Sequence, residues 1–243
     1  MKSTLRDIVQ HTHGLGNIDL VKITGTAEET IINAIAEDRS VILEAKFKAP
    51  VAEFIGTVGM PNLGKLNTIL NIPEYKDEAK ITVTRQDRNG ESVPVGIHFE
   101  NAASDFKNDY RFMAAEIVND KLKAVKFKGV KWGVDIVPTV ASIQRLKFQA
   151  SANSEETTFV AKTENGNLKF YFGDAASHAG DFVFESGVAG SLTKSWSWPV
   201  NSVISILSLS GDKTFKISDE GAAMITVDSG IAEYSYIIPA QTK

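Results

Sequence analysis

The sequence predicts an α+β protein of two similar domains, each with two helices packed on antiparallel sheet. Three observations favour this fold class. Helix-like segments, with apolar residues at helical spacing, alternate along the chain with strand-like segments. The four expected helices begin at residues 3, 61, 139 and 199, so the second half repeats the spacing of the first to within about two residues. Hairpin-like segments flank the helices in both halves.

Four segments place their apolar residues on one side of a helix. The expected helices cover residues 3–13, 61–70, 139–152 and 199–209. Prolines open the second and the fourth, which suits the first turn of a helix. The inward faces are expected to hold Leu5, Ile8 and Val9; Leu63, Leu66 and Leu70; Ile143, Leu146 and Ala150; and Val203, Ile206 and Leu207.

The remaining segments read as strands, because β-branched and aromatic residues alternate with polar ones between turn residues. In the first half they are 20–26, 30–36, 41–49 and a hairpin over 79–99. In the second half they are a hairpin over 157–174, strands 181–188 and 192–198, a hairpin over 213–228 and a last strand, 232–240. This layout gives domains of residues 1–118 and 131–243, joined by a basic connector over 119–130. A single irregular β-sandwich with four incidental helices is the alternative.

The charge pattern of the four helices is unusual for an acidic chain. The formal net charge is −4, yet Asp7 is the only acid in the four expected helices. The outward faces are expected to hold Ser3, Arg6, Asp7 and Gln10; Lys65 and Thr68; Ser142, Arg145 and Gln149; and Asn201, Ser205 and Ser208. Lys147 lies at the edge of the apolar face. Exposed helices usually mix acids with bases, so these faces suit a surface that lies near phosphate. Short helices that carry few charges by chance are the plain alternative.

Composition excludes several classes of protein. Without cysteine there is no disulfide, thiolate nucleophile or Cys-ligated metal. The N-terminus lacks the apolar core of a signal peptide and no stretch is apolar enough to span a membrane, so a cytoplasmic protein is expected. The mild acidity argues against a protein that grips nucleic acid by bulk charge.

No motif predicts catalysis, a metal site or a cofactor. Residues 59–66, GMPNLGKL, have the glycines and lysine of a phosphate-binding loop, but Leu66 stands where Ser or Thr must bind magnesium. His11 and His13 point to different sides of a helix, so they cannot share a metal, and both are expected at the surface. The chain is therefore not expected to be an enzyme.

Two tryptophans support an alternative function. Trp196 and Trp198 share one face of an expected strand and could stack on sugar rings. A carbohydrate-binding module, or a phage structural β-protein, therefore remains the alternative, although aromatic pairs more often pack in a core or interface.

Beyond these patterns, the sequence resembles the DNA sliding clamps, which are polymerase processivity factors. The resemblance rests on the repeated layout, on the acid-poor helices, and on the segments EFIGTVGMPNLGKLNTIL, SIQRLKFQ and AEYSYIIPA. It is nearest in kind to the trimeric clamps of T4-like bacteriophages, and it covers nearly the whole chain.

The resemblance implies a closed ring of six domains, hence a homotrimer, with helices lining a hole for duplex DNA and sheets paired across subunit edges. It implies two further partners, an ATP-driven clamp loader and a DNA polymerase, and no cofactor. For a phage protein the location would be the cytoplasm of the infected cell. The DNA-facing residues would be Arg6, Lys65, Arg145, Lys147, Gln149 and Ser142, with Lys2, Lys121, Lys123 and Lys126 as weaker additions. The pocket for the polymerase peptide would involve Ile237, Ile238 and Pro239.

Overall fold

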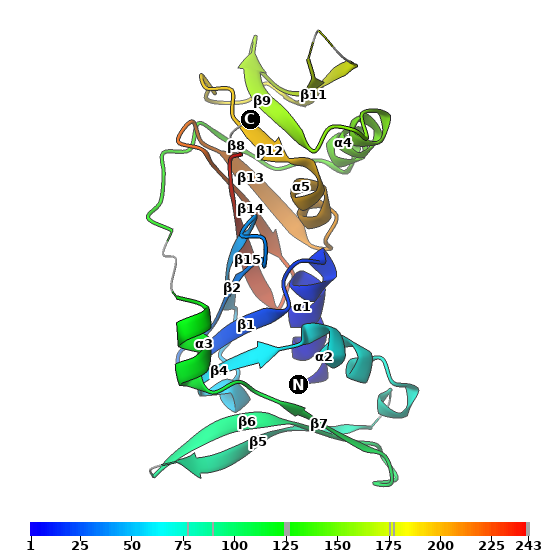
Figure 1. Cartoon of the computed structure of the whole chain (residues 1–243), viewed down its shortest axis with the longest axis vertical. Coiled ribbons are helices and arrows are strands. Elements are labelled where there is room, and N and C mark those ends of the chain that lie inside the picture. The colour runs from blue at the N-terminus through cyan, green and yellow to red at the C-terminus, as the bar shows by residue number, and fades with distance from the viewer. Residues whose placement is uncertain (77, 89, 124–126, 175, 177, 242–243) are drawn as a thin grey trace. The chain divides into compact units, whose positions relative to one another are not determined.

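The computed structural model describes residues 1–76, 78–88, 90–123, 127–174, 176 and 178–241 (Figure 1). The chain divides into two compact units. The first is Met1–Val125 with Ser229–Tyr234, and the second is Lys126–Asp228 with Ser235–Lys243. Both units combine a helix pair with antiparallel strands, so the predicted α+β class is confirmed.

The first unit packs its helices on antiparallel strands. Its helices are α1 (Lys2–His11), α2 (Leu63–Leu70) and α3 (Ala115–Lys121). One set of strands runs in the order β4 (Gly56–Pro61), β1 (Leu20–Gly25), β2 (Thr30–Ile35) and β3 (Ile42–Phe47). A separate sheet holds β5 (Lys80–Arg88), β6 (Glu91–Glu100) and β7 (Lys107–Arg111) in that order. The start of β15 (Ala232–Pro239) also belongs to this unit.

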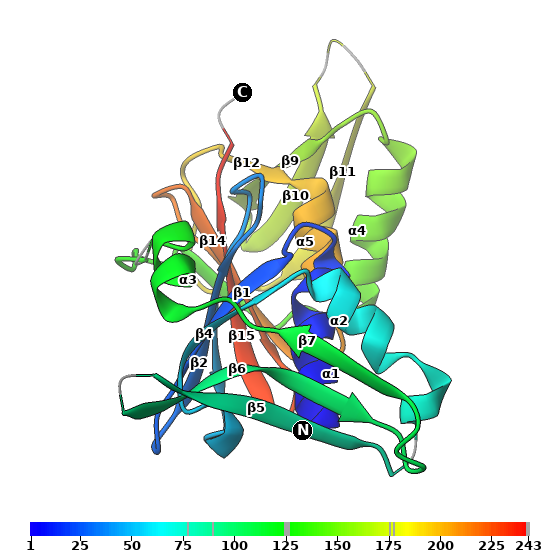
Figure 2. The same cartoon turned by 60° about the horizontal axis from the view of Figure 1, so that its bottom comes forward.

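The core of the first unit lies between the helix pair and the strands. Leu5 and Ile8 of α1 and Leu66 of α2 are fully buried. Alternate residues of β1, including Val21 and Ile23, are fully buried as well, because successive strand residues point to opposite faces. Figures 1 and 2 show α1 and α2 side by side, which places both outer faces on one side of this unit.

The second unit repeats this arrangement with α4 (Val140–Ala152) and α5 (Val200–Leu207). One set of its strands runs in the order β15, β14 (Ala222–Asp228), β13 (Asp212–Ile217) and β8 (Val134–Ile136). A separate sheet holds β11 (Ala179–Ser186), β10 (Asn167–Gly173), β9 (Thr158–Glu164) and β12 (Ser197–Pro199) in that order. Aromatic rings fill its core, and Phe170 stacks on Phe184 with 4.5 Å between centroids. The turn between β9 and β10 uses Asn165 and Gly166 at positive φ, as a tight hairpin requires.

The four expected helices are confirmed, and they begin at residues 2, 63, 140 and 200. The second begins later than expected because Pro61 pairs with Leu20 and ends β4. Since β4 runs antiparallel to β1, GMPNLGKL lies outside the parallel setting that a phosphate-binding loop needs. The expected strand 192–198 shortens to β12, since the backbone at Thr193 and Lys194 instead donates to Asp219.

Several elements escaped prediction. They are β4, β7, β8 and α3. The last forms at Ala115–Lys121, where the connector was expected to begin. Residues 124–126 of that connector, with Lys126, lie outside the described residues.

Candidate nucleic-acid interface

The helix pair of the first unit exposes a polar surface. In α1 the exposed residues are Ser3, Arg6 and Gln10, and in α2 they are Lys65 and Thr68. Both helices lie wholly within the described residues, and neither exposes an acid. The predicted exposure of these five side chains is confirmed.

Asp7, the one acid in the four helices, faces inward. It is 8% exposed, and its Oδ2 accepts hydrogen bonds from the hydroxyls of Tyr234 at 2.8 Å and Ser229 at 3.0 Å. One turn later, His11 is buried and stacks on the Tyr234 ring, with 4.4 Å between centroids. The predicted exposure of Asp7 and of His11 is therefore wrong, because residues 229–234 cover this side of α1. The inward turn of Asp7 removes the only carboxylate from the outer helix faces.

Two cations of α1 are held at carbonyl groups at and beyond the end of α2. The Arg6 Nη2 donates to the Leu70 carbonyl at 3.4 Å, and the Lys2 Nζ donates to the carbonyls of Tyr75 and Lys76. Positive charge is favoured near the C-terminus of a helix, where carbonyls lack partners. Arg6 is thereby positioned while its guanidinium stays exposed.

Lys65, unlike Arg6, is not fixed by a contact of its side chain within the described structure. Its side chain makes no hydrogen bond or ion pair with any residue that the structure describes. Of the weaker candidates, Lys121 is exposed, whereas Lys123 pairs with Asp120 at 3.3 Å. Lys65 therefore carries the freest positive charge on the first helix pair.

In the second unit, α4 packs against β11 through the residues predicted to face outward. The Gln149 Nε2 donates to the Asp181 carbonyl at 3.0 Å, and the Arg145 guanidinium lies 5.4 Å from the Phe182 ring centre. Arg145 is exposed, as predicted, but Gln149 is half-buried. The predicted open position of Gln149 is therefore wrong, because the strand beside the helix binds its amide.

Ser142 is also placed differently from the prediction. Thr139 caps α4 by accepting the Ser142 N–H at 3.0 Å, and the two hydroxyls lie 2.7 Å apart. Ser142 is 8% exposed as a result, so its predicted outward position is wrong. Lys147, expected at the edge of the apolar face, is half-buried on the opposite flank of α4 from Gln149.

The exposed surface of α4 includes large apolar side chains as well as polar ones. Val140 is 86% exposed and Phe148 is 64% exposed, and Val137, just before the helix, is also exposed. Leu146 is buried, as predicted, so Phe148 lies outside the inward face. The face of α5 is polar and uncharged, with Asn201 and Ser208 exposed. Charge on the second helix pair therefore comes from Arg145 and Lys147 alone.

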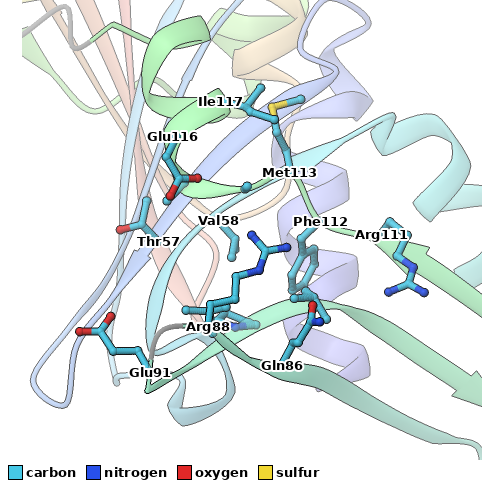
Figure 3. A pocket seen from close by; sticks show the side chains of 15 residues that line it. Thr57, Val58, Gln86, Arg88, Glu91, Arg111, Phe112, Met113, Glu116 and Ile117 are labelled. Atoms are coloured by element: carbon cyan, nitrogen blue, oxygen red, sulfur yellow. The ribbon is translucent and has the colours of Figure 1, made fainter.

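Of the three side chains named for the partner pocket at the C-terminal strand, two are buried. Ile237 is 4% exposed and Ile238 is fully buried within β15, while Pro239 is exposed. The pocket at this strand therefore stays a prediction. A groove of about 670 Å³ lies in the first unit, between β4, the β5–β6 hairpin and the start of α3 (Figure 3). No sequence motif marked this groove.

The described part of the chain contains neither a metal-binding cluster of side chains nor a membrane-spanning helix. No group of three or more His, Asp or Glu side chains among the described residues is arranged to hold a metal ion. None of the helices in this part of the chain is long and apolar enough to cross a bilayer.

The two-unit architecture is similar to that of solved sliding clamps. PCNA of A. fulgidus, in a structure with the C-terminal region of FEN-1 bound, matches with a TM-score of 0.72 over 100% of this chain and 96% of that one. The chain has a PCNA-like fold. PCNA of Thermococcus kodakaraensis matches with a TM-score of 0.69 over 99% and 97% of the two chains.

The likeness to PCNA is one of fold, because the sequences are only 8% and 12% identical. No protein-family model matches the sequence, and no curated protein matches it. The resemblance to sliding clamps inferred from the sequence is thus confirmed at the level of the fold.

Proposed function

We propose that the chain is a sliding clamp, a processivity factor that encircles duplex DNA and tethers a DNA polymerase. One observation carries this proposal: a PCNA-like fold whose outer helix faces hold cations and no acid, because Asp7 is turned inward. Such a surface can lie against DNA phosphates without recognising a base sequence, as sliding along DNA requires. In this role the protein acts as a scaffold and not as an enzyme.

The second candidate function, a carbohydrate-binding module, depended on an exposed pair of tryptophans, and the structure does not expose them as a pair. Trp198 is 1% exposed, and the indole N–H of Trp196 donates to the Asp219 carbonyl at 2.8 Å. The two rings therefore form no open platform for a sugar.

We propose that three chains close the ring. β7 and β11 are edge strands of their sheets, and an unpaired edge is a template for another strand. Beside β11, α4 exposes Val140 and Phe148. Apolar side chains that continue a free edge suit contact with a second copy of the chain. The β7 edge of one subunit would pair with the β11 edge of the next, and Phe148 would be buried at that joint.

Within the ring, Arg6, Lys65, Arg145 and Lys147 would face the phosphates. Ser142 is omitted because it is buried, and Gln149 could contribute only if it left the Asp181 carbonyl. The polymerase and an ATP-driven loader would be the protein partners. The A. fulgidus protein holds a segment of FEN-1, and this chain would take partner segments in a similar way. A trimer of the T4-like phage type, in the cytoplasm of an infected cell, is the specific form we propose.

The proposal is tested by topological retention on DNA. The chain has no cysteine, so a variant with Asp109→Cys in β7 and Val183→Cys in β11 can be joined selectively by a flexible bismaleimide. It is mixed with nicked circular plasmid, cross-linked and washed in high salt. Closed rings should stay on the circle and leave after a restriction enzyme linearises it. Loss from the circle in salt, or equal retention on linear DNA, would refute encirclement.

A further inference from the structure

The edge strand β7 of the first unit carries alternating charges on its exposed side. Lys107, Asp109 and Arg111 are exposed, and Tyr110 between the last two faces the core. The charges along this side therefore run positive, negative, positive. A strand of another copy that paired with β7 would bring its own exposed side chains directly opposite these three.

The edge strand β11 of the second unit offers a short regular stretch. Its register with β10 shifts between Leu168 and Lys169, and Phe184 of β11 is the residue left without an opposite partner. An extra residue of this kind is a β-bulge, which disturbs the regular pairing of its strand. The regular edge open to another copy is therefore residues 179–183, and the one charge on this stretch is the exposed Asp181.

The charges of the two edges differ in how firmly their own unit holds them. Arg111 makes no side-chain hydrogen bond or ion pair with any residue that the structure describes. Lys107, in contrast, pairs with Glu100 at 3.2 Å. Among the described residues, the Asp181 carboxylate has one ion-pair partner, the Lys169 Nζ, at 3.7 Å, which is too long for a hydrogen bond. Arg111 and Asp181 are therefore the cation and the anion best able to take a new partner.

Side-chain alternation limits how β7 can pair with β11 of another copy. Tyr110 and Phe182 both pack in the cores of their own units, with 2% and 7% of their surfaces exposed. They must lie on the same side of a shared sheet, so the register can change only in steps of two residues. Both edges already pair antiparallel with their own neighbours, β6 and β10, and a sheet continued across the joint keeps that order.

Charge then separates the registers that remain. The fullest antiparallel overlap, residues 107–111 with 179–183, sets Asp109 directly opposite Asp181, and like charges in that position are destabilising. A shift of two residues in one direction sets Arg111 opposite Asp181 and Asp109 opposite an uncharged valine. The opposite shift would set a lysine that is already paired, Lys107, opposite Asp181.

We propose that an ion pair between Arg111 of one chain and Asp181 of the next sets the register of the joint, and that Asp109 excludes the register in which it would face Asp181. The inference rests on the proposed clamp function and adds which residues select the partner. Arginine can bind a carboxylate through two parallel hydrogen bonds. Because Arg111 lies in the first unit and Asp181 in the second, each chain supplies the cation at one joint and the anion at the other, so that copies join head to tail.

The first test measures the association of subunits by analytical ultracentrifugation over a dilution series. Arg111→Asp and Asp181→Arg should each lower the association constant by about tenfold per joint, because each sets like charges opposite each other. The double variant, which carries both changes in one chain, restores opposite charges and should recover most of this loss. Arg39→Glu, a charge reversal in the exposed β2–β3 turn, should associate like the unmodified protein.

The second test traps the register with disulfides, since the chain has no cysteine of its own. Opposite residues of antiparallel strands have Cα atoms about 4.5–5.5 Å apart, a separation that a disulfide can bridge. Asp109→Cys with Val183→Cys should therefore link subunits on mild oxidation. Lys107→Cys with Val183→Cys, which are opposite only in the fullest overlap, should link them poorly. Both cysteine variants retain Arg111 and Asp181.

Failure of this inference is distinguishable from failure of the clamp. If the double variant associates no better than the single variants, or if Lys107→Cys links to Val183→Cys more readily than Asp109→Cys does, the register is wrong while the trimer stands. A one-chain mass for the unmodified protein would overturn the clamp and the joint together. Circular dichroism checks the fold of each variant, and the cysteine variants still decide the register if a charge variant unfolds.

Discussion

The hydroxyl of Tyr234 donates a hydrogen bond to the buried carboxylate of Asp7, with 2.8 Å between the oxygens. The two residues are 227 positions apart in sequence, yet they lie in the same unit. The bond fastens the C-terminal strand to the first helix. It also keeps the one carboxylate of α1, α2, α4 and α5 away from their outer faces, which links the stability of this unit to the proposed function.

Replacing Tyr234 by Phe should destabilise the first unit. The ring and its stacking on His11 remain, but Asp7 keeps only the Ser229 hydroxyl as a side-chain donor from this segment. A hydrogen bond to a charged group contributes about 1.5–3 kcal/mol, so the free energy of unfolding should fall by about that amount in urea titrations. The exposed change Ser3→Ala, on the same helix, serves as the control. Equal stability of Tyr234→Phe and the unmodified protein would show that the bond contributes nothing.

Charge reversal at Lys65 should weaken binding to DNA without affecting assembly. Removing one lysine–phosphate interaction reduces the slope of log K against log salt by about one. Lys65→Glu should therefore bind duplex DNA more weakly and with a shallower salt slope. Arg145→Glu should behave likewise and should also reduce loading and processive synthesis. Arg39→Glu carries the same charge change away from the helices and should match the unmodified protein. If all three variants bind alike, the helix faces do not contact DNA.

Replacing Phe148 by Ser should weaken the association of subunits. Burial of a phenylalanine contributes about 1.5–3 kcal/mol, so each joint should lose roughly tenfold to a hundredfold in association constant. Analytical ultracentrifugation over a dilution series measures this shift. Ile117→Ser removes another exposed apolar side chain and should leave assembly intact. An unchanged association constant for Phe148→Ser would show that Phe148 of α4 is not part of the joint between subunits.

Glu100 should titrate far below an ordinary glutamate. The hydrogen bond from Ser104, and then that from Lys107, lower its pKa from 4.5 to about 2. Because the pKa is lowered by folding, these contacts stabilise the folded chain fully above about pH 4.5, and the contribution is lost as pH falls through about 2. Carboxyl NMR titration should show the pKa rising more with Ser104→Ala than with Lys107→Met. The reverse order would contradict the assignment of the main cause.

Local pattern predicted the helices well, because their apolar residues recur at helical spacing and their positions repeat in both halves. It could not place Asp7, whose inward position depends on Ser229 and Tyr234 at the other end of the chain. Helical projection treats every polar residue opposite the core as exposed. It therefore has no means of seeing a distant strand that covers part of that face.

The prediction of which α4 residues face outward failed for a related reason. Periodicity identified Leu146 as buried, but it assumed that solvent covers the remaining faces. The strand β11 binds Gln149 instead, and Phe148 is left outside. A side chain that we propose to pack against another subunit looks like an irregularity in a single sequence. The groove beside α3 was invisible as well, since its residues come from four separate segments.

The most direct test of the central claim is the mass of the protein in solution. Multi-angle light scattering at micromolar concentration should give three times the 26.4 kDa of one chain, because two PCNA-like units per chain complete a six-domain ring only as a trimer. A particle of one chain under those conditions, with the fold intact by circular dichroism, would contradict the account.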